Sequence, residues 1–139
     1  IAQADMQAHV HLVMGRSHVV QAACDVALVA SGTATLETAL HKRPMVIAYK
    51  MQWLSWQIAN RKRLLPWIGL PNILCTESLV PEFLQEQVQP QALAQAVLRW
   101  LDEPAAVTKI QQRFADLHLQ LRQDMPTLAS HAIQKVLAA

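Results

Sequence analysis

Residues 25–37 have the clearest capacity for chemistry in this chain, because an apolar run ends there in a polar turn. The turn is Ser31-Gly32, and a predicted helix begins directly after it. The unpaired N–H groups at a helix start converge and favour negative charge. Gly32 would let a ligand approach the backbone, and the hydroxyls of Thr33 and Thr35 could donate to phosphate oxygens. The pattern therefore predicts an anion site.

Glu37 lies one turn further along the same predicted helix. An ionised carboxylate only accepts hydrogen bonds, so it suits two neighbouring ribose hydroxyls. Phosphate at the turn and sugar at the glutamate together indicate a nucleotide. A structural interpretation stays open, because Ser, Gly and Thr are ordinary capping residues and Glu37 could pair with His41.

Strands and helices alternate around this segment. Apolar runs and turn residues predict strands at 9–14, 26–30 and 45–49, with helices at 17–23, 33–41 and 51–64. Such alternation is typical of parallel strands in a doubly wound α/β sheet. We predict a loop at 69–72 from its turn residues.

Helices are expected over the rest of the chain. Their predicted ranges are 81–87, 90–101, 104–122 and 126–137, with prolines at or near the first turns. Within the third of these, apolar residues recur at helical spacing and predict a core stripe: Val107, Ile110, Phe114, Leu117 and Leu121.

The charge of the chain is close to balanced, at +2, but it is unevenly placed. No acidic residue occurs between Glu37 and Glu77. That interval holds six basic residues and three of the four tryptophans: Lys42, Arg43, Lys50, Arg61, Lys62, Arg63, Trp53, Trp56 and Trp67. This composition favours an anionic ligand or a membrane surface. Nucleic acid fits poorly, because the whole chain is only weakly basic and has no nucleic-acid motif. Tryptophans in the core beside a solvated basic helix end remain an alternative.

Other site classes find little support in the sequence. His9 and His11 alternate without a carboxylate or thiol at ligand spacing, so we predict no metal site. Cys24 and Cys75 are expected to be reduced thiols. No apolar run reaches the ~20 residues that a transmembrane helix needs. The chain begins at Ile1 rather than Met and has no signal peptide, so we interpret it as a fragment.

Several blocks of the chain, in order, resemble the C-terminal part of bacterial lipid-A-disaccharide synthase, a glycosyltransferase family of the two-domain GT-B fold. The blocks are 25–37, 44–49, 70–74, 79–85 and the tail around 114–118. The resemblance implies a partial Rossmann-like, UDP-sugar-binding region in residues 1–80. C-terminal helices in residues 81–139 would pack on it in the same domain. It also implies a hexosyltransferase that is active at full length and inactive as this chain alone.

That family joins a UDP-activated diacylglucosamine donor to an acylated glucosamine phosphate acceptor. The resemblance assigns the donor site to Ser31, Gly32, Thr33 and Thr35 at the pyrophosphate, Glu37 at the ribose and Asn72 near the transferred sugar. No cofactor is expected, because helix N–H groups and basic side chains would stabilise the departing UDP. The catalytic residues stay unknown, because the resemblance places the acceptor domain outside this chain.

Both substrates carry acyl chains, so the resemblance implies a cytoplasmic enzyme peripheral to the inner membrane of a Gram-negative bacterium. We expect a membrane contact through Trp53, Trp56, Arg61, Lys62 and Arg63. An open sheet without its first strands would expose an edge, which favours a homo-oligomer.

Two alternatives stay open at this point. One is another GT-B enzyme that uses UDP-GlcNAc, such as a peptidoglycan glycosyltransferase or a sugar epimerase. The other is a non-catalytic helical domain that docks on a partner or a membrane, in which the Ser31-Gly32 turn is only a helix cap. The contribution of Glu37 to UDP binding separates the UDP-sugar enzymes from the non-catalytic docking domain, in which this charge should scarcely matter.

Overall fold

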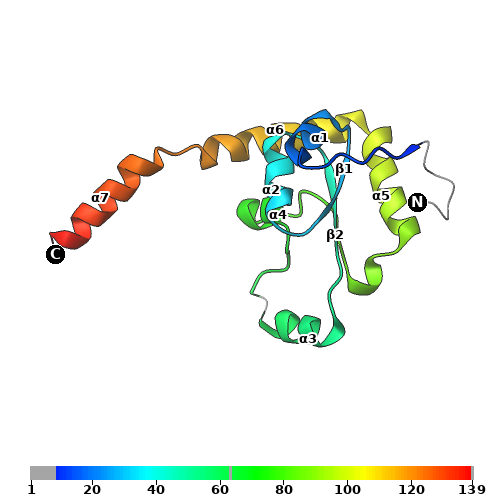
Figure 1. Ribbon diagram of the computed structural model, residues 1–139, viewed down its shortest axis with the longest axis horizontal. Helices are drawn as coiled ribbons and strands as arrows, with labels where there is room; N and C mark the ends of the chain where they lie inside the picture. The colour runs from blue at the N-terminus through cyan, green and yellow to red at the C-terminus, as the bar shows by residue number, and fades with distance from the viewer. Residues whose placement is uncertain (1–8, 63, 139) are drawn as a thin grey trace.

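Three parallel strands form the centre of the computed structural model, which describes residues 9–62 and 64–138 (Figure 1). They are β1 (Ala27–Ala30), β2 (Met45–Tyr49) and β3 (Glu82–Leu84), in the order β1-β2-β3. The register pairs Ala27 with Met45 and Ile47 with Glu82. This parallel sheet confirms the predicted α/β class.

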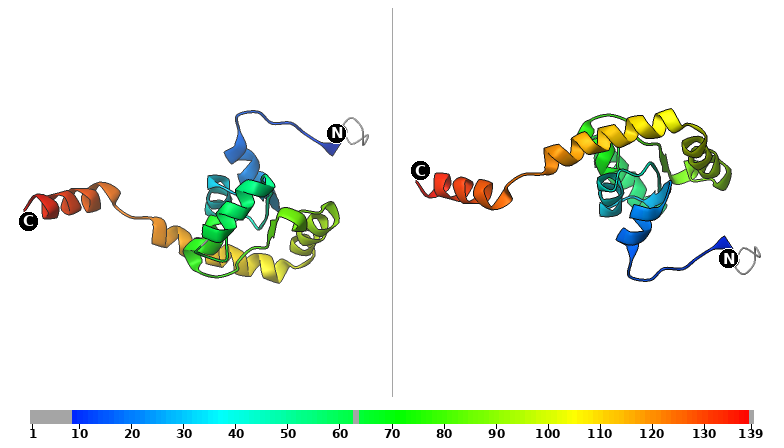
Figure 2. Two further views of the ribbon diagram at one scale, coloured as in Figure 1. Left: turned by 90° about the horizontal axis from the view of Figure 1, so that it is seen from below. Right: turned by 90° about the horizontal axis from the view of Figure 1, so that it is seen from above.

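Helices connect and cover these strands. Their bounds are α1 (Ser17–Ala23), α2 (Thr33–Leu40), α3 (Trp53–Lys62), α4 (Leu70–Cys75), α5 (Pro90–Asp102), α6 (Pro104–Leu121) and α7 (Met125–Leu137), with a 3-10 turn, η3 (Gln85–Gln87). α2 packs on β1 and β2, α5 packs on β2, and α6 packs on α2 and α4. α5 lies on one side of the sheet and α2 and α4 on the other, while α7 projects away from the body (Figures 1 and 2).

The core lies between β2 and α6. Met45 and Ile47 are fully buried, because β2 has a strand on each side and helices over it. Ile110, Phe114 and Leu117 of α6 are also buried, as their spacing predicts. The outer members of the predicted stripe differ: Val107 is half-buried, and Leu121 is exposed at the end of α6.

The strand predicted at residues 9–14 is wrong, because this segment forms no strand and is exposed throughout. An alternating pattern becomes a strand only when another strand supplies hydrogen-bond partners, and the described residues offer none here. The burial predicted for residues 26–30 is also only partly right. β1 pairs with β2 alone within the described ranges, and Leu28 is exposed.

The loop predicted at residues 69–72 is wrong, because α4 begins at Leu70. Pro71 lies in the first turn of that helix, where its missing N–H costs nothing. Gly69 and Pro71, which we interpreted as loop residues, therefore mark a helix start.

The helix predicted at residues 81–87 is also wrong. Residues 82–84 form β3, and a single 3-10 turn follows. Pro81 precedes the strand and its carbonyl accepts from the Ile47 N–H at 3.0 Å, so the segment pairs with a strand distant in sequence. The region 81–139 therefore contributes a strand to the sheet as well as helices.

Candidate functional site

A pocket of about 370 Å³ lies at the carboxyl ends of β1 and β2. In an open α/β sheet, this end is where ligands bind. The strand ends contribute the turn after β1 and the residues after β2, and α3 and the segment before α4 close the sides. The pocket is lined by Ser31, Gly32, Tyr49, Met51, Trp56, Asn60 and Ile68.

The Ser31-Gly32 turn takes the position that the sequence predicts. Gly32 is exposed and has φ +141° and ψ −165°, a conformation essentially confined to glycine. α2 begins directly after it, with no side-chain cap and no acidic residue in its first turn. The Thr35 N–H donates to the Gly32 carbonyl at 3.1 Å, which leaves the N–H groups of the two preceding helix residues with the capacity to bind an anion.

The two threonines of α2 differ in position. Thr33 is exposed at the first helical residue. Thr35 is fully buried, and its hydroxyl donates to the Gly32 carbonyl at 2.7 Å and accepts from the Leu70 N–H at 3.3 Å. We therefore correct the expectation that Thr35 reaches a phosphate: its hydroxyl joins the starts of α2 and α4.

Glu37 is half-exposed, but it is not among the residues that line the pocket. Its Oε2 lies 3.9 Å from the Nδ1 of His18 on α1, rather than beside His41. The structure thus keeps the carboxylate accessible near the start of α2. It does not bring Glu37 into the same cavity as Ser31 and Gly32.

Asn72 is a second correction to the predicted site. Its side chain is fully buried and makes four hydrogen bonds. Its Nδ2 donates to the Val80 carbonyl at 2.9 Å and to Glu82 Oε1 at 2.8 Å, and its Oδ1 accepts from the N–H groups of Leu79 at 2.9 Å and Val80 at 3.0 Å. All of its polar capacity is used inside the protein, so Asn72 joins α4 to the start of β3 instead of facing a sugar.

Glu82 supports the pocket from behind, although sequence reasoning did not identify it. Its two carboxylate oxygens accept from the N–H groups of Ile68 at 2.8 Å and Gly69 at 2.9 Å. A Cβ at Gly69 would overlap the Cδ1 of Ile47 and lie 3.0 Å from Glu82 Oε1, so a larger residue there would require these side chains to move. Since Ile68 lines the pocket, Glu82 fixes one of its walls.

Gln85 holds the opposite wall in a similar way. Its Oε1 accepts from the Met51 N–H at 2.8 Å, and its Nε2 donates to the Met51 carbonyl at 3.1 Å. The side chain is buried and its backbone has φ +51°. Glu82 and Gln85 both belong to the 79–85 block. Because we predicted a helix there, their contacts with Ile68 and Met51, on either side of α3, could not be foreseen.

The residues predicted to contact a membrane separate into different environments. Trp53 and Arg61 are exposed on α3. Trp56 is half-buried and lines the pocket, so the expectation that it contacts a membrane is replaced by a place in the site. The side chain of Lys62 and all of Arg63 lie outside the described residues.

The two cysteines are free and half-buried. Burial raises the pKa of both thiols, and the nearby Arg43 and Arg113 partly oppose this effect at Cys24 and Cys75 respectively. A raised pKa lowers the fraction of reactive thiolate.

The described part of the chain contains no group of three His, Cys, Asp or Glu residues that could hold a metal ion. In the same part, no helix combines the length and the apolar character needed to span a bilayer.

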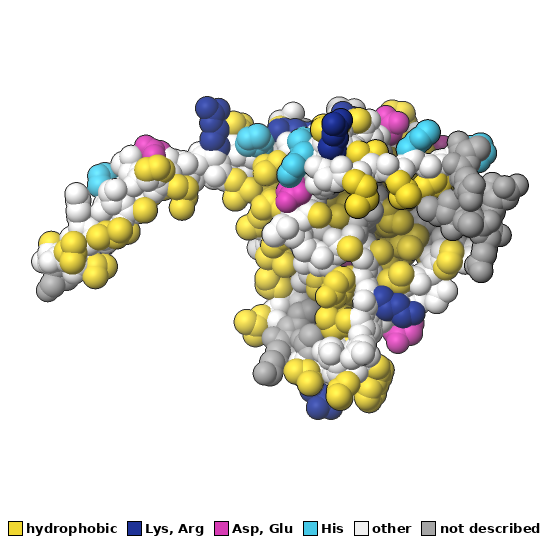
Figure 3. Space-filling model, viewed as in Figure 1, with side chains coloured by type: hydrophobic (Ala, Val, Ile, Leu, Met, Phe, Trp, Pro, Cys, Tyr) yellow, Lys and Arg dark blue, Asp and Glu magenta, His cyan; other side chains and the backbone are white. Residues whose placement is uncertain are grey.

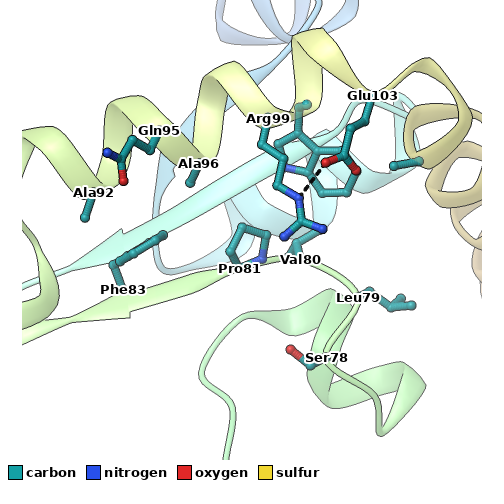
Figure 4. Close-up of a pocket in the computed structure, with 12 residues that line it drawn as sticks. Ser78, Leu79, Val80, Pro81, Phe83, Ala92, Gln95, Ala96, Arg99 and Glu103 are labelled. Atoms are coloured by element: carbon teal, nitrogen blue, oxygen red, sulfur yellow. Dashed lines mark hydrogen bonds and ion pairs between the residues drawn. The ribbon is translucent and has the colours of Figure 1, made fainter.

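A second, larger pocket of about 570 Å³ lies between α5 and the segment that leads into β3 (Figure 4). Its walls are mostly apolar, with Val80, Pro81, Phe83 and Ala96 facing the cavity. The one ion pair drawn at its rim joins Arg99 to Glu103 at 3.0 Å, and both side chains are exposed. Its lining includes the start of α6, at the N-cap residue Glu103 and at Ala106, but it lies beside the start of β3 and not at a strand carboxyl end.

Comparison with known proteins links the chain to one family. The model of the family described as lipid-A-disaccharide synthetase matches residues 1–136. A lipid-A-disaccharide synthase of Albidiferax ferrireducens is 61% identical over 136 residues, covering 95% of this chain and 35% of that protein. The enzyme of the same name from Verminephrobacter eiseniae is 51% identical over 139 residues, covering 97% and 36%. The chain therefore spans about a third of the length of these curated relatives.

Proposed function

Because the chain belongs to the lipid-A-disaccharide synthase family, we propose that it forms the donor-binding part of a hexosyltransferase. The complete reaction transfers the sugar of UDP-2,3-diacylglucosamine onto 2,3-diacylglucosamine 1-phosphate, giving lipid A disaccharide and UDP. An acceptor hydroxyl forms the new bond to the sugar, the sugar–phosphate bond breaks, and UDP leaves with its electron pair. The acceptor proton passes to a base that we expect outside this chain.

The pocket at the carboxyl ends of β1 and β2 is the observation that carries this proposal. Its volume of about 370 Å³ lies in the usual range of small-molecule sites, roughly 300–1,000 Å³. The pyrophosphate would lie at Ser31 and Gly32, with Thr33 as a further donor. The N–H groups of α2 would stabilise the charge that develops on UDP as it leaves, without a metal ion.

Glu37 would bind the ribose of the same nucleotide. Its carboxylate is half-exposed and, among the described residues, has only a distant partner in His18, at 3.9 Å, so it keeps the capacity to accept from two hydroxyls. This role requires the nucleotide to extend from the pocket along the outside of α2.

We further propose that the donor region is one domain, with β3 completing the sheet of residues 1–80 and the following helices packed on it. The full enzyme would act at the cytoplasmic surface of the inner membrane, where its acylated acceptor resides. Self-association would cover the free edge of β1.

The test measures UDP binding by calorimetry in a chimaera, in which this chain replaces the matching part of the Albidiferax ferrireducens enzyme. Glu37→Ala should weaken binding about ten- to a hundredfold, the effect of removing a charged acceptor at roughly 1.5–3 kcal/mol. Glu103→Ala is the matched control, because it removes a carboxylate at the larger pocket.

Unchanged UDP binding in Glu37→Ala would reject the ribose assignment. If neither the parent chimaera nor its variants bind UDP, while the chimaera retains its fold by circular dichroism, the docking-domain alternative replaces the enzyme proposal. Release of UDP from the acylated donor in the presence of the acceptor measures the complete reaction.

A further inference from the structure

The segment between β2 and α4 leaves the body of the protein and returns to it. It carries α3 at one end of the molecule, apart from the helices that cover the sheet (Figure 1). Both ends of the segment are held by β3 and η3 side chains, at Met51 by Gln85 and at Ile68 by Glu82. α3 is therefore presented at a fixed place rather than on an unrestrained loop.

The two sides of α3 have different surroundings. Trp56 and Asn60, one turn apart, line the pocket. Leu54, Ile58 and Arg61 follow each other at helical spacing on a different face and are exposed. The space-filling view shows hydrophobic side chains and basic charge at the end of the molecule formed by α3 (Figure 3).

The exposure of the outer face is large for apolar side chains. Leu54 is 65% exposed and Ile58 54%. Trp53, at the first position of the helix and one turn before Trp56, is 67% exposed at the border of this face. Leu64, just after the helix, is 96% exposed. A contiguous apolar surface of this kind indicates an interaction site.

Charge identifies the partner that this surface fits. No acidic residue occurs between Glu37 and Glu77, whereas Arg61 is exposed beside the apolar side chains. An apolar helix face with tryptophan and basic residues, and without acidic ones, is typical of helices that lie in the headgroup region of an anionic bilayer.

α7 is a useful contrast within the same chain. It also exposes apolar side chains, with Ile133 60% and Val136 77% exposed. It begins after Asp124, carries one basic residue, Lys135, and no tryptophan, and projects away from the body of the protein. Apolar exposure alone therefore does not distinguish α3, whereas its tryptophans and its place beside the pocket do.

We propose that α3 docks on an anionic lipid bilayer, with Leu54 and Ile58 inserted at the headgroup boundary, Trp53 at the border of this face where the helix begins, and Arg61 beside lipid phosphates. This inference rests on the proposed function, because it names the surface from which that pocket receives its acylated ligand. Trp56 and Asn60 then form a wall whose outer side is the membrane. The sugar nucleotide can enter the pocket while its acyl chains remain in lipid.

The first experiment measures flotation of the chain with vesicles of phosphatidylcholine containing phosphatidylglycerol, and with vesicles of phosphatidylcholine alone. The double variant Leu54→Ser, Ile58→Ser should lose on the order of tenfold or more in partitioning to the anionic vesicles. Its matched control is Ile133→Ser, Val136→Ser on α7, which should bind as the parent does. Arg61→Gln should lose roughly fivefold on anionic vesicles and nothing on neutral ones.

A second experiment measures how deeply α3 inserts into the bilayer. Brominated lipids should quench the tryptophan fluorescence of the parent, and Trp53→Phe should remove most of that quenching. Trp100→Phe is the control, because the Trp100 indole donates to the Met45 carbonyl at 3.1 Å and packs against the core. Unchanged quenching in Trp53→Phe contradicts the proposal even if the serine variants fail to fold.

The outcomes also separate this inference from the proposed function. Vesicle binding that is unchanged in the α3 serine variant, or lost in the α7 variant, overturns the inference, whatever the UDP affinity of the chimaera. The inference is also overturned if the chain does not bind vesicles and instead self-associates through Leu54 and Ile58, as measured by sedimentation. If the parent and the α7 variant bind vesicles and the α3 variant does not, the result supports the inference. This holds even if UDP binding fails and the proposed function is rejected.

Discussion

The two pockets described above differ in more than their volume. The larger one, beside α5, has about 570 Å³ and mostly apolar walls, whereas the smaller one has about 370 Å³ and contains the Ser31-Gly32 turn. Only the smaller pocket lies at strand carboxyl ends, beside the start of α2. At the larger pocket the helix start is that of α6, and its N-cap residue is the acidic Glu103, whereas α2 begins after Gly32. The comparison teaches that sheet polarity and the charge beside a helix start, more than volume, indicate where an anionic ligand binds.

The walls of the two pockets are also held differently. The smaller one is held by half-buried hydrogen bonds of Glu82 on β3 and Gln85 on η3. At the larger one, the ion pair between Arg99 and Glu103 is exposed, and such pairs contribute little. We therefore expect substitutions that preserve volume to matter at the first pocket and not at the second.

The largest expected effect is that of Glu82→Gln. The carboxylate accepts three hydrogen bonds, from Ile68 N, Gly69 N and Asn72 Nδ2, and an amide group would place a donor against at least one of these donors. We expect the free energy of unfolding to fall by about 1–3 kcal/mol in chemical denaturation. Glu103→Gln, its counterpart at the larger pocket, should change it by less than about 0.5 kcal/mol. Equal effects would remove the distinction between the two sets of walls.

Gly32→Ala should have the next largest effect. A Cβ at this position meets open space, so the cost comes from the backbone, whose φ of +141° is strained for any other residue. We expect a loss of about 1–3 kcal/mol in stability or a shift of the turn that weakens UDP binding. Gly15→Ala, at φ +68° and also in open space, is the control for strain away from the pocket and should leave UDP affinity unchanged. Normal UDP affinity in a stable Gly32→Ala protein would argue against ligand contact at the turn.

The smallest expected effect is that of Ala96→Leu, which adds apolar volume to the larger pocket. UDP affinity, measured by calorimetry in the chimaera, should stay within about twofold of the parent, because the change is smaller than roughly 0.5 kcal/mol at a site that does not touch the ligand. A marked loss of affinity would mean that the larger pocket binds the nucleotide, and the comparison would then be reversed.

Local signals in the sequence predicted much of this fold. The alternation of β1, α2 and β2 follows from apolar runs interrupted by Gly32 and Pro44, and α5 and α6 follow from helical spacing after their prolines. The errors share a cause. β3 exists because residues 82–84 pair with residues 47–49, and no local pattern encodes a backbone partner 35 positions away.

The candidate site shows the same limit. The turn at Ser31-Gly32 was predictable, because glycine between a strand and a helix has few other uses. Thr35 and Asn72 were expected to face a ligand, yet both are buried and fully hydrogen-bonded inside the protein. A residue type states which hydrogen bonds a side chain can make, whereas only the packed structure states which partner receives them.

The two braces at Met51 and Ile68 have a consequence for how this protein could vary or be redesigned. The segment between Met51 and Ile68, which includes α3, is anchored at both ends, so it could be exchanged as a unit. A different helix placed between the same anchors would change the surface that the protein presents while leaving the sheet and the Ser31-Gly32 turn intact. Because Trp56 and Asn60 of α3 line the pocket, the exchange would also replace one pocket wall, so the outer surface and that wall would vary together.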